Sequence, residues 1–374
     1  MSESRALALR RVSAVVAFGV LPSLALVSML VIGLRTDSLA ADFHHELYPQ
    51  AKLLLDGVNP FPDPSWDPLA GANFIWPPLA GYVVAPLTVL PAGAADVVIA
   101  FLGLVGLGLS LWLVGVRDWR VYGVFCLWPE MAGEMRVSHL TPVLALAAAV
   151  AWRARQTSGP PGLAIGLATS VKFLMWPLLV WLAATRRTRD VLVAGAVVCG
   201  SLLLVLPYTG LDPYVRSLLR LGRAFDQDSY TVFGLLVQAG APEALARAAM
   251  LVVGCALLVA TWRYRSFTLA IAAALALSPI VWLDYFALAA VPLAIHRPRL
   301  SWVWFAPIAT WGLSGAGLGI GEFWHTARLL VVFAIVLGVA LAAERDAAAN
   351  DPAAPTREPV RPGIAGRFGR SSTA

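Results

Sequence analysis

Two ionisable residues could do chemistry because of the apolar sequence beside them. Lys172 lies in the middle of the stretch 165–177, in which its neighbours are apolar or neutral. An ionisable group inside such a stretch is costly, so by default it marks a site. Its ammonium group is therefore predicted to bind an anion, and the alternative is a lysine that snorkels to the membrane interface.

Asp42 is the second of these residues. It opens a polar segment only a few residues beyond the first long apolar run. A carboxylate that is partly desolvated at a membrane surface can accept a proton from a hydroxyl group. A solvated loop aspartate or a helix cap is the alternative interpretation.

Three arginines, Arg216, Arg220 and Arg223, repeat at intervals of three to four residues. That spacing places them on one side of a short helix, with leucines between them. Such a cationic side could bind a phosphate. An interfacial helix that contacts anionic lipid headgroups is the alternative.

Neither a metal nor a cofactor is expected. Neighbouring residues of a helix do not face one another, so His44, His45 and Glu46 are not expected to hold a metal. Asp226 and Asp228 resemble a metal–nucleotide motif but are interpreted as a solvated turn in an outer loop. The sequence contains no glycine-rich phosphate loop, nucleophile elbow or H-E-x-x-H motif.

The elements that must position these residues are transmembrane helices. Of the 374 residues, 59% are apolar and 13% are charged, whereas about 25% of the residues in a soluble domain are charged. At about 20 residues per span, the chain has room for roughly ten spans and no large soluble domain. The net charge of +6 is spread over small arginine clusters. Such clusters orient a membrane protein and do not indicate nucleic-acid binding.

The arginine clusters also predict the topology, because positive residues stay on the cytoplasmic side. Residues 1–343 are expected to form one domain of a multi-pass cell-membrane protein, with both termini in the cytoplasm. Within it, residues 35–75 form a first outer loop and residues 207–230 form a second. Residues 344–374 are predicted to be a disordered cytoplasmic tail.

Three stretches between basic clusters are too short to cross the membrane twice. Residues 121–152, 161–184 and 267–295 are each roughly 25 to 32 residues long, and two full spans need about 40. They are expected to be hairpins of short or half helices, whose non-helical turns survive only inside protein or a water-filled cavity. The predicted fold is all-α and polytopic, with roughly 10 to 13 full or half transmembrane helices.

Under this topology the outer loops and the hairpin turns meet on the outer side of the membrane. Asp42, Lys172 and the three loop arginines would lie there. Further ionisable residues from the hairpins would join them: Glu134, His139 and Asp284. The sequence therefore predicts an outward-facing site that contains both a base and a binder of anions.

Four motifs on this chain, in order, resemble the pattern of glycosyltransferase family 87. They are Asp42, Tyr48 and Asn59-Pro60-Phe61; Trp76-Pro-Pro and Pro86-Leu; Lys172 to Pro177; and Ser278-Pro-Ile-Val-Trp282. The resemblance covers roughly residues 35 to 300.

The resemblance implies a GT-C fold and a reaction. The enzyme would move a sugar, mannose or arabinofuranose, from a polyprenyl-phosphate donor to a hydroxyl of an envelope glycolipid or polysaccharide, with inversion. Asp42 would be the general base. Lys172, Arg216, Arg220 and Arg223 would bind the donor phosphate. Six residues are expected to line the substrates: Tyr48, Trp76, Glu134, His139, Trp282 and Asp284.

Two places depart from the family pattern. Ser138-His139 stands where Gly-Gln is frequent, and Asp284-Tyr285 stands where histidine is common. These changes affect the expected donor or acceptor contacts more than the expected reaction.

A transporter or lipid flippase is the main alternative, since broken helices around a central site are also typical of transporters. Transporters place their charges near the bilayer midplane, whereas the ionisable residues of this chain are expected in outer loops and outer turns. A noncatalytic assembly subunit, in which Asp42 only caps a helix, is a third hypothesis.

Overall fold

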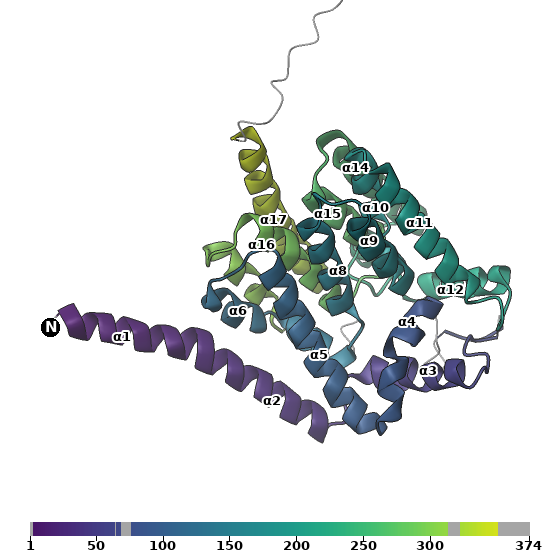
Figure 1. The fold of residues 1–374 in the computed structure, drawn as a ribbon, viewed down its shortest axis with the longest axis horizontal. Coiled ribbons are helices and arrows are strands. Elements are labelled where there is room, and N and C mark those ends of the chain that lie inside the picture. Colours follow the sequence, from purple (N-terminus) through teal and green to yellow (C-terminus); the bar gives the residue numbers. More distant parts are fainter. Residues whose placement is uncertain (1–2, 64, 69–75, 313–321, 351–374) are drawn as a thin grey trace, which may run out of the picture.

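The computed structural model describes residues 3–63, 65–68, 76–312 and 322–350 (Figure 1). Within these residues every regular element is helical and no β-strand occurs. The α-helices are α1 (Glu3–Val15), α2 (Leu21–Arg35), α3 (Tyr48–Leu55), α4 (Pro78–Val84), α5 (Ala92–Leu113), α6 (Trp119–Cys126), α7 (Pro129–Val137), α8 (Thr141–Arg153), α9 (Pro160–Val171), α10 (Pro177–Ala184), α11 (Thr188–Leu203), α12 (Leu211–Phe225), α13 (Val232–Gln238), α14 (Glu243–Tyr264), α15 (Phe267–Leu277), α16 (Ala290–His296) and α17 (Phe323–Ala349). Shorter π-helical or 3₁₀ segments are η1 (Val16–Val20), η2 (Phe43–Leu47), η3 (Ala85–Val89), η4 (Phe173–Met175), η5 (Leu283–Ala289) and η6 (Trp302–Thr310).

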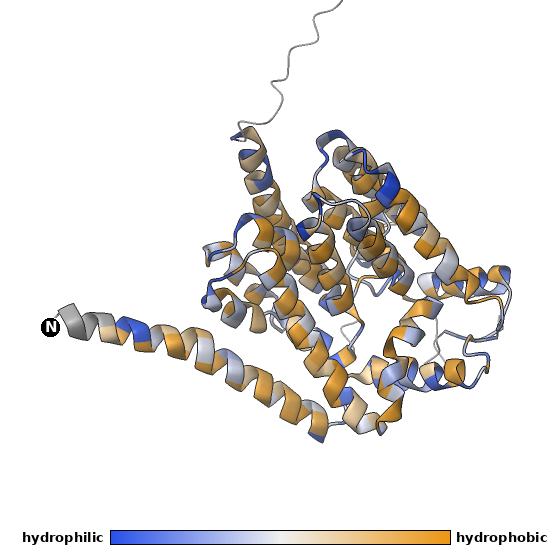
Figure 2. Cartoon of the chain, in the orientation of Figure 1, coloured by the Kyte–Doolittle hydropathy of each residue, from blue (hydrophilic) through white to orange (hydrophobic). Residues whose placement is uncertain are grey.

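Four helices in the described part of the chain are long and apolar enough to cross a membrane: Ala8–Arg35, α5, α14 and α17. Helices α7 and α8 form a fifth candidate span that is bent by 119°. Large apolar side chains such as Ile32, Phe101 and Val252 are exposed on these helices, and Figure 2 shows long apolar bands along α2 and α5. Apolar surface this extensive requires lipid, so the prediction of an all-α polytopic membrane protein is confirmed.

The first long helix runs along one side of the bundle in Figure 1, and its segments η1 and α2 contact α6. Gly123 of α6 lies against the backbone of Phe18, where an added Cβ atom would overlap the Phe18 carbonyl oxygen. The Phe18 ring also packs edge-on against Trp119, with 6.3 Å between the ring centroids. This crossing therefore depends on a glycine.

The three stretches predicted to be hairpins are each interrupted. The chain leaves the helix at 138–140 between α7 and α8, at Lys172 between α9 and α10, and at 278–282 between α15 and α16. Ser138 and Leu140 adopt left-handed φ angles of 54° and 63°, which let the chain reverse within three residues. Such backbone costs free energy in non-glycine residues and is found most often at functional sites.

The two segments predicted to be the first and second outer loops, 35–75 and 207–230, pack against each other and keep these names below. The Tyr208 hydroxyl donates a hydrogen bond to the Leu54 carbonyl oxygen over 3.1 Å, and the rings of Phe61 and Tyr214 are 5.2 Å apart. Tyr214 belongs to α12, so the second loop contains a helix that rests on the first loop (Figure 1).

The first residues of the predicted disordered tail, 344–349, are helical. Helix α17 continues to Ala349, and Glu344 has a structural role. Its carboxylate accepts hydrogen bonds from the Ser266 hydroxyl over 2.6 Å and from the Phe267 backbone N–H over 3.0 Å. It thus caps the free N–H groups at the start of α15. The rest of the predicted tail, 351–374, lies outside the described residues.

Candidate active site

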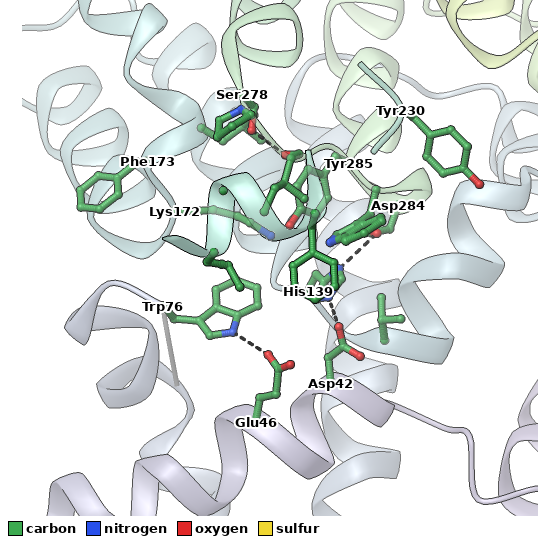
Figure 3. A pocket seen from close by; sticks show the side chains of 18 of the residues that line it. Asp42, Glu46, Trp76, His139, Lys172, Phe173, Tyr230, Ser278, Asp284 and Tyr285 are labelled. Carbon is green, nitrogen blue, oxygen red and sulfur yellow. Dashed lines mark hydrogen bonds and ion pairs between the residues drawn. The ribbon is translucent and has the colours of Figure 1, made fainter. Parts of the chain in front are cut away.

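A cavity of about 940 Å³ lies where the three helix breaks meet the first outer loop and α12. Each break contributes to its lining: His139 from the first, Lys172 from the second, and Ser278, Pro279, Ile280 and Trp282 from the third. Asp42 and Glu46 line it from the first outer loop (Figure 3). The non-helical backbone thus surrounds a cavity, as a membrane interior requires.

Asp42 and Lys172 line the same cavity. Lys172 ends α9 with an extended backbone, φ −153° and ψ 120°. Its buried Nζ lies 3.6 Å from the centroid of the Tyr285 ring and 4.2 Å from that of Trp76. Within the described residues this Nζ has no hydrogen-bond partner. Aromatic faces stabilise the ammonium only in part, so it retains the capacity to bind an anion.

Asp42 is the first member of a chain of hydrogen-bonded side chains. Its Oδ2 contacts Nε2 of His139, and Nδ1 of His139 lies 3.2 Å from Oδ1 of Asp284. Thr141 donates its hydroxyl to Oδ2 of Asp284 over 2.8 Å. The Asp42 side chain is 29% exposed, whereas those of His139 and Asp284 are 6% and 3% exposed. All three residues line the cavity, and Asp42 has the most exposed side chain of the three.

Glu46 is a second carboxylate on the cavity wall, one helical turn after Asp42. It accepts a hydrogen bond from Nε1 of Trp76 over 3.3 Å (Figure 3). Burial, and next the nearby negative charge of Asp42, raise the pKa of Glu46 from 4.5 to about 7. Near neutral pH this group can therefore either donate or accept a hydrogen bond.

The arginines of α12 do not line the cavity. Arg216 pairs with Asp212 on the exposed side of the helix, and Arg220 donates to the Trp66 carbonyl oxygen over 3.0 Å. Arg223 is exposed as well. The opposite side of α12 faces the cavity through apolar residues: Leu218, Leu219, Leu221, Gly222 and Phe225. The predicted spacing on one helix face is therefore correct, but the leucine side is the one that faces the site.

A different arginine lines the cavity. Arg136 lies in the last turn of α7, just before the break that carries His139. The Arg136 side chain makes no hydrogen bond and no ion pair within the residues that the structure describes. Arg136 and Lys172 are the two strongly basic residues of the described cavity wall.

The other predicted lining residues divide into two groups. Trp76, His139, Trp282 and Asp284 line the cavity. Tyr48 does not, because its hydroxyl donates to the Leu90 carbonyl oxygen over 2.7 Å and holds the outer loop to the bundle. Glu134 is buried behind the cavity wall.

The polar and aromatic cavity residues missing from the predicted site include Glu46, Tyr285 and Arg136. Glu46 was considered only as part of a metal site, although its spacing of four residues from Asp42 already places the two on one helix face. Tyr285 adjoins Asp284 and carries the ring beneath Lys172. Arg136 had no signal in the sequence, because basic residues at helix ends are common.

His44 and Asp226, from the two motifs considered as metal sites, each contact another side chain. His44 Nδ1 lies 2.7 Å from an oxygen of Asp96, outside the cavity. Asp226 pairs with Arg247 over 2.8 Å. Among the residues that the structure describes, no group of three His, Cys, Asp or Glu side chains is arranged to hold a metal ion.

Comparison with known proteins gives one match. The sequence model described as glycosyltransferase family 87 matches residues 74–284, which is more than half of the chain. No curated protein and no solved structure matches.

Proposed function

Because this chain belongs to glycosyltransferase family 87 and is thus a membrane glycosyltransferase, we propose that its donor is a sugar linked to polyprenyl phosphate. The sugar is mannose or arabinofuranose, and the acceptor is a hydroxyl group of an envelope glycolipid or polysaccharide. The reaction inverts the anomeric carbon, with Asp42 as general base.

One observation carries this proposal: a carboxylate and an unpaired ammonium line a cavity that is otherwise largely apolar. Asp42 and Lys172 supply polar groups to it, whereas α12 and the end of α15 supply apolar side chains such as Leu221, Phe225 and Leu277. A donor with a charged phosphate and a hydrocarbon chain matches both kinds of group. A free nucleotide sugar would leave the apolar side chains without a partner.

The reaction follows from these groups. The acceptor hydroxyl gives its proton to Asp42 as its oxygen forms a bond to the anomeric carbon. The bond between that carbon and the phosphate oxygen breaks, and the electron pair leaves with the lipid phosphate. Attack from the side opposite the leaving group inverts the carbon.

Lys172 assists this departure, because a cation that binds the phosphate more strongly as charge develops lowers the barrier. Arg136 is the second phosphate ligand, since it also lines the cavity. We assign a different task to Arg216, Arg220 and Arg223. On the exposed side of α12 they attract anionic lipid headgroups, the donor's among them, to the membrane surface.

The site lies on the outer face in this proposal, with the N-terminus and the C-terminus in the cytoplasm. The arginine clusters of the sequence support that orientation through the positive-inside rule. A transporter or flippase is disfavoured by the family match and by a carboxylate positioned to act as a base.

The direct test incubates the purified protein with polyprenyl-phosphate mannose and polyprenyl-phosphate arabinofuranose in separate reactions with lipid acceptors. We expect one donor to yield lipid phosphate together with a glycosylated acceptor in equal amounts. Nucleotide sugars should give neither product. Turnover of a nucleotide sugar, with both lipid donors inert, would contradict the proposal.

A further inference from the structure

The two ring nitrogens of His139 each face a carboxylate oxygen, one from Asp42 and one from Asp284. A neutral imidazole has one N–H group and one lone pair. In the neutral form, one of these carboxylates would therefore face a lone pair, which is repulsive. Only the imidazolium form donates to both at once.

We infer that His139 is a doubly protonated positioning residue that holds the general base Asp42 from behind, while Asp284 holds His139. This role goes beyond the proposed glycosyl transfer. Only the kinetic consequences of the role depend on that proposed function. Asp284 is fixed in turn by the hydroxyl of Thr141.

The contact with His139 determines which oxygen of Asp42 remains available to a substrate. His139 occupies Oδ2 of Asp42, and Oδ1 of Asp42 makes no hydrogen bond within the described part of the chain. Oδ1 is thus the oxygen left for the acceptor hydroxyl. Fixing one oxygen of a carboxylate sets the direction in which the other one points, and small errors in such geometry are costly.

The backbone supports the same role. Ser138 and Leu140, on either side of His139, both have left-handed φ angles. The rings of Trp76 and Tyr285 flank the imidazole, each with its centroid 5.7 Å from that of His139. The imidazole is therefore restrained by two neighbouring aromatic rings and by a contact at each of its nitrogens.

The charges around the imidazole come from every element packed against it. Asp42 and Glu46 face it from the first outer loop, and Asp284 faces it from η5. Glu134 interacts with it from α7. Lys172 and Arg136 line the same cavity, and the ring of Tyr285 lies beside the imidazole. The carboxylates in hydrogen-bonding contact with the imidazole are those of Asp42 and Asp284, one at each ring nitrogen.

The protonation state can be measured without any substrate. The chain has five histidines, so ring ¹⁵N resonances of histidine-labelled protein in nanodiscs can be assigned by the variant His139→Gln. At pH 7.5 we expect both His139 nitrogens to be protonated in the wild type. We expect one of them to lose its proton in Asp284→Asn. One protonated and one bare nitrogen in the wild type would overturn the inference.

Kinetics then test the positioning role. His139→Gln and Asp284→Asn should lower kcat about 10- to 100-fold, with the dissociation constant of the donor unchanged. An unchanged kcat in both variants, or a loss of donor binding that parallels the loss of kcat, would mean that His139 does not position Asp42 and would overturn the inference.

His44→Gln is the matched control. It removes another histidine–aspartate contact, that with Asp96, from the same outer segment but outside the cavity. Its rate should equal that of the wild type. If every lipid-linked donor proves inert, the proposed function fails while the NMR result still decides the state of His139.

Discussion

Nζ of Lys172 lies 3.6 Å from the centroid of the Tyr285 ring, over its face. The same nitrogen lies 4.2 Å from the centroid of the Trp76 ring. No carboxylate forms an ion pair with it in the described residues, although Asp42 and Asp284 line the same cavity. The rings hold the ammonium in place and leave its N–H groups available for a phosphate.

Lys172→Met should weaken donor binding and turnover together. A charged hydrogen bond contributes roughly 1.5–3 kcal/mol, so kcat/KM for the donor should fall about 10- to 100-fold. The measurement is a donor titration in detergent or nanodiscs. The matched control is Lys52→Met, because Lys52 is the only other lysine of the chain and also lies over a tyrosine ring, but on an exposed surface. Equal losses in both variants would refute the assignment.

Arg136→Gln and Arg223→Gln separate the two groups of arginines. Arg136 lines the cavity and Arg223 does not. We expect donor affinity to fall about tenfold in Arg136→Gln, since an ionic hydrogen bond to phosphate is lost. Arg223→Gln should change donor affinity in detergent by less than about twofold, because headgroup attraction acts only at a bilayer. A larger loss of donor affinity in Arg223→Gln than in Arg136→Gln would contradict this assignment and indicate a phosphate site on α12.

Glu46→Gln should alter the pH dependence of stability. The pKa of Glu46 is raised from 4.5 to about 7, mainly by burial and then by Asp42, so the folded protein holds this proton more tightly than the unfolded chain. The resulting stabilisation is complete below pH 4.5 and is lost as the pH rises through 7. We expect Glu46→Gln to raise Tm by on the order of 2 °C at pH 8 relative to the wild type. The gain should vanish at pH 4.5, and a gain of equal size at both pH values would contradict this account.

Gly123→Ala should loosen the first long helix. The added methyl group would overlap the backbone of Phe18, and overpacking of this kind costs about 1–3 kcal/mol. Gly108→Ala in α5 is the control, because no atom lies within 4 Å of the position of its Cβ. Thermal unfolding should show a lower Tm for Gly123→Ala and an equal or higher Tm for Gly108→Ala.

Much of the fold was predictable because hydrophobic length and arginine position are local signals. The hairpin interruptions followed from counting residues between basic clusters. Lys172 stood out because a lysine surrounded by apolar residues has few structural roles. The helix spacing of the α12 arginines was also predictable.

Which side of each helix faces the cavity was not predictable. Spacing shows that Arg220 and Leu221 lie on different sides of α12, but only packing against the first outer loop decides which side meets the cavity. Arg136 lines the cavity at the end of α7, where the chain bends by 119° into α8. No local sequence pattern predicts that bend. His139 and Asp284, the two departures from the family pattern, were expected to contact substrates. In the fold they contact each other, across 145 residues of sequence.

Asp42→Asn gives the most direct test of the central claim that Asp42 activates the acceptor in the same cavity in which Lys172 binds the donor phosphate. Donor binding and single-turnover transfer should be measured on the same preparation, with the exposed loop variant Asp56→Asn as control. We expect Asp42→Asn to bind the lipid-linked donor as the wild type does and to transfer its sugar about 10²- to 10⁴-fold more slowly. Transfer at the wild-type rate would contradict the account.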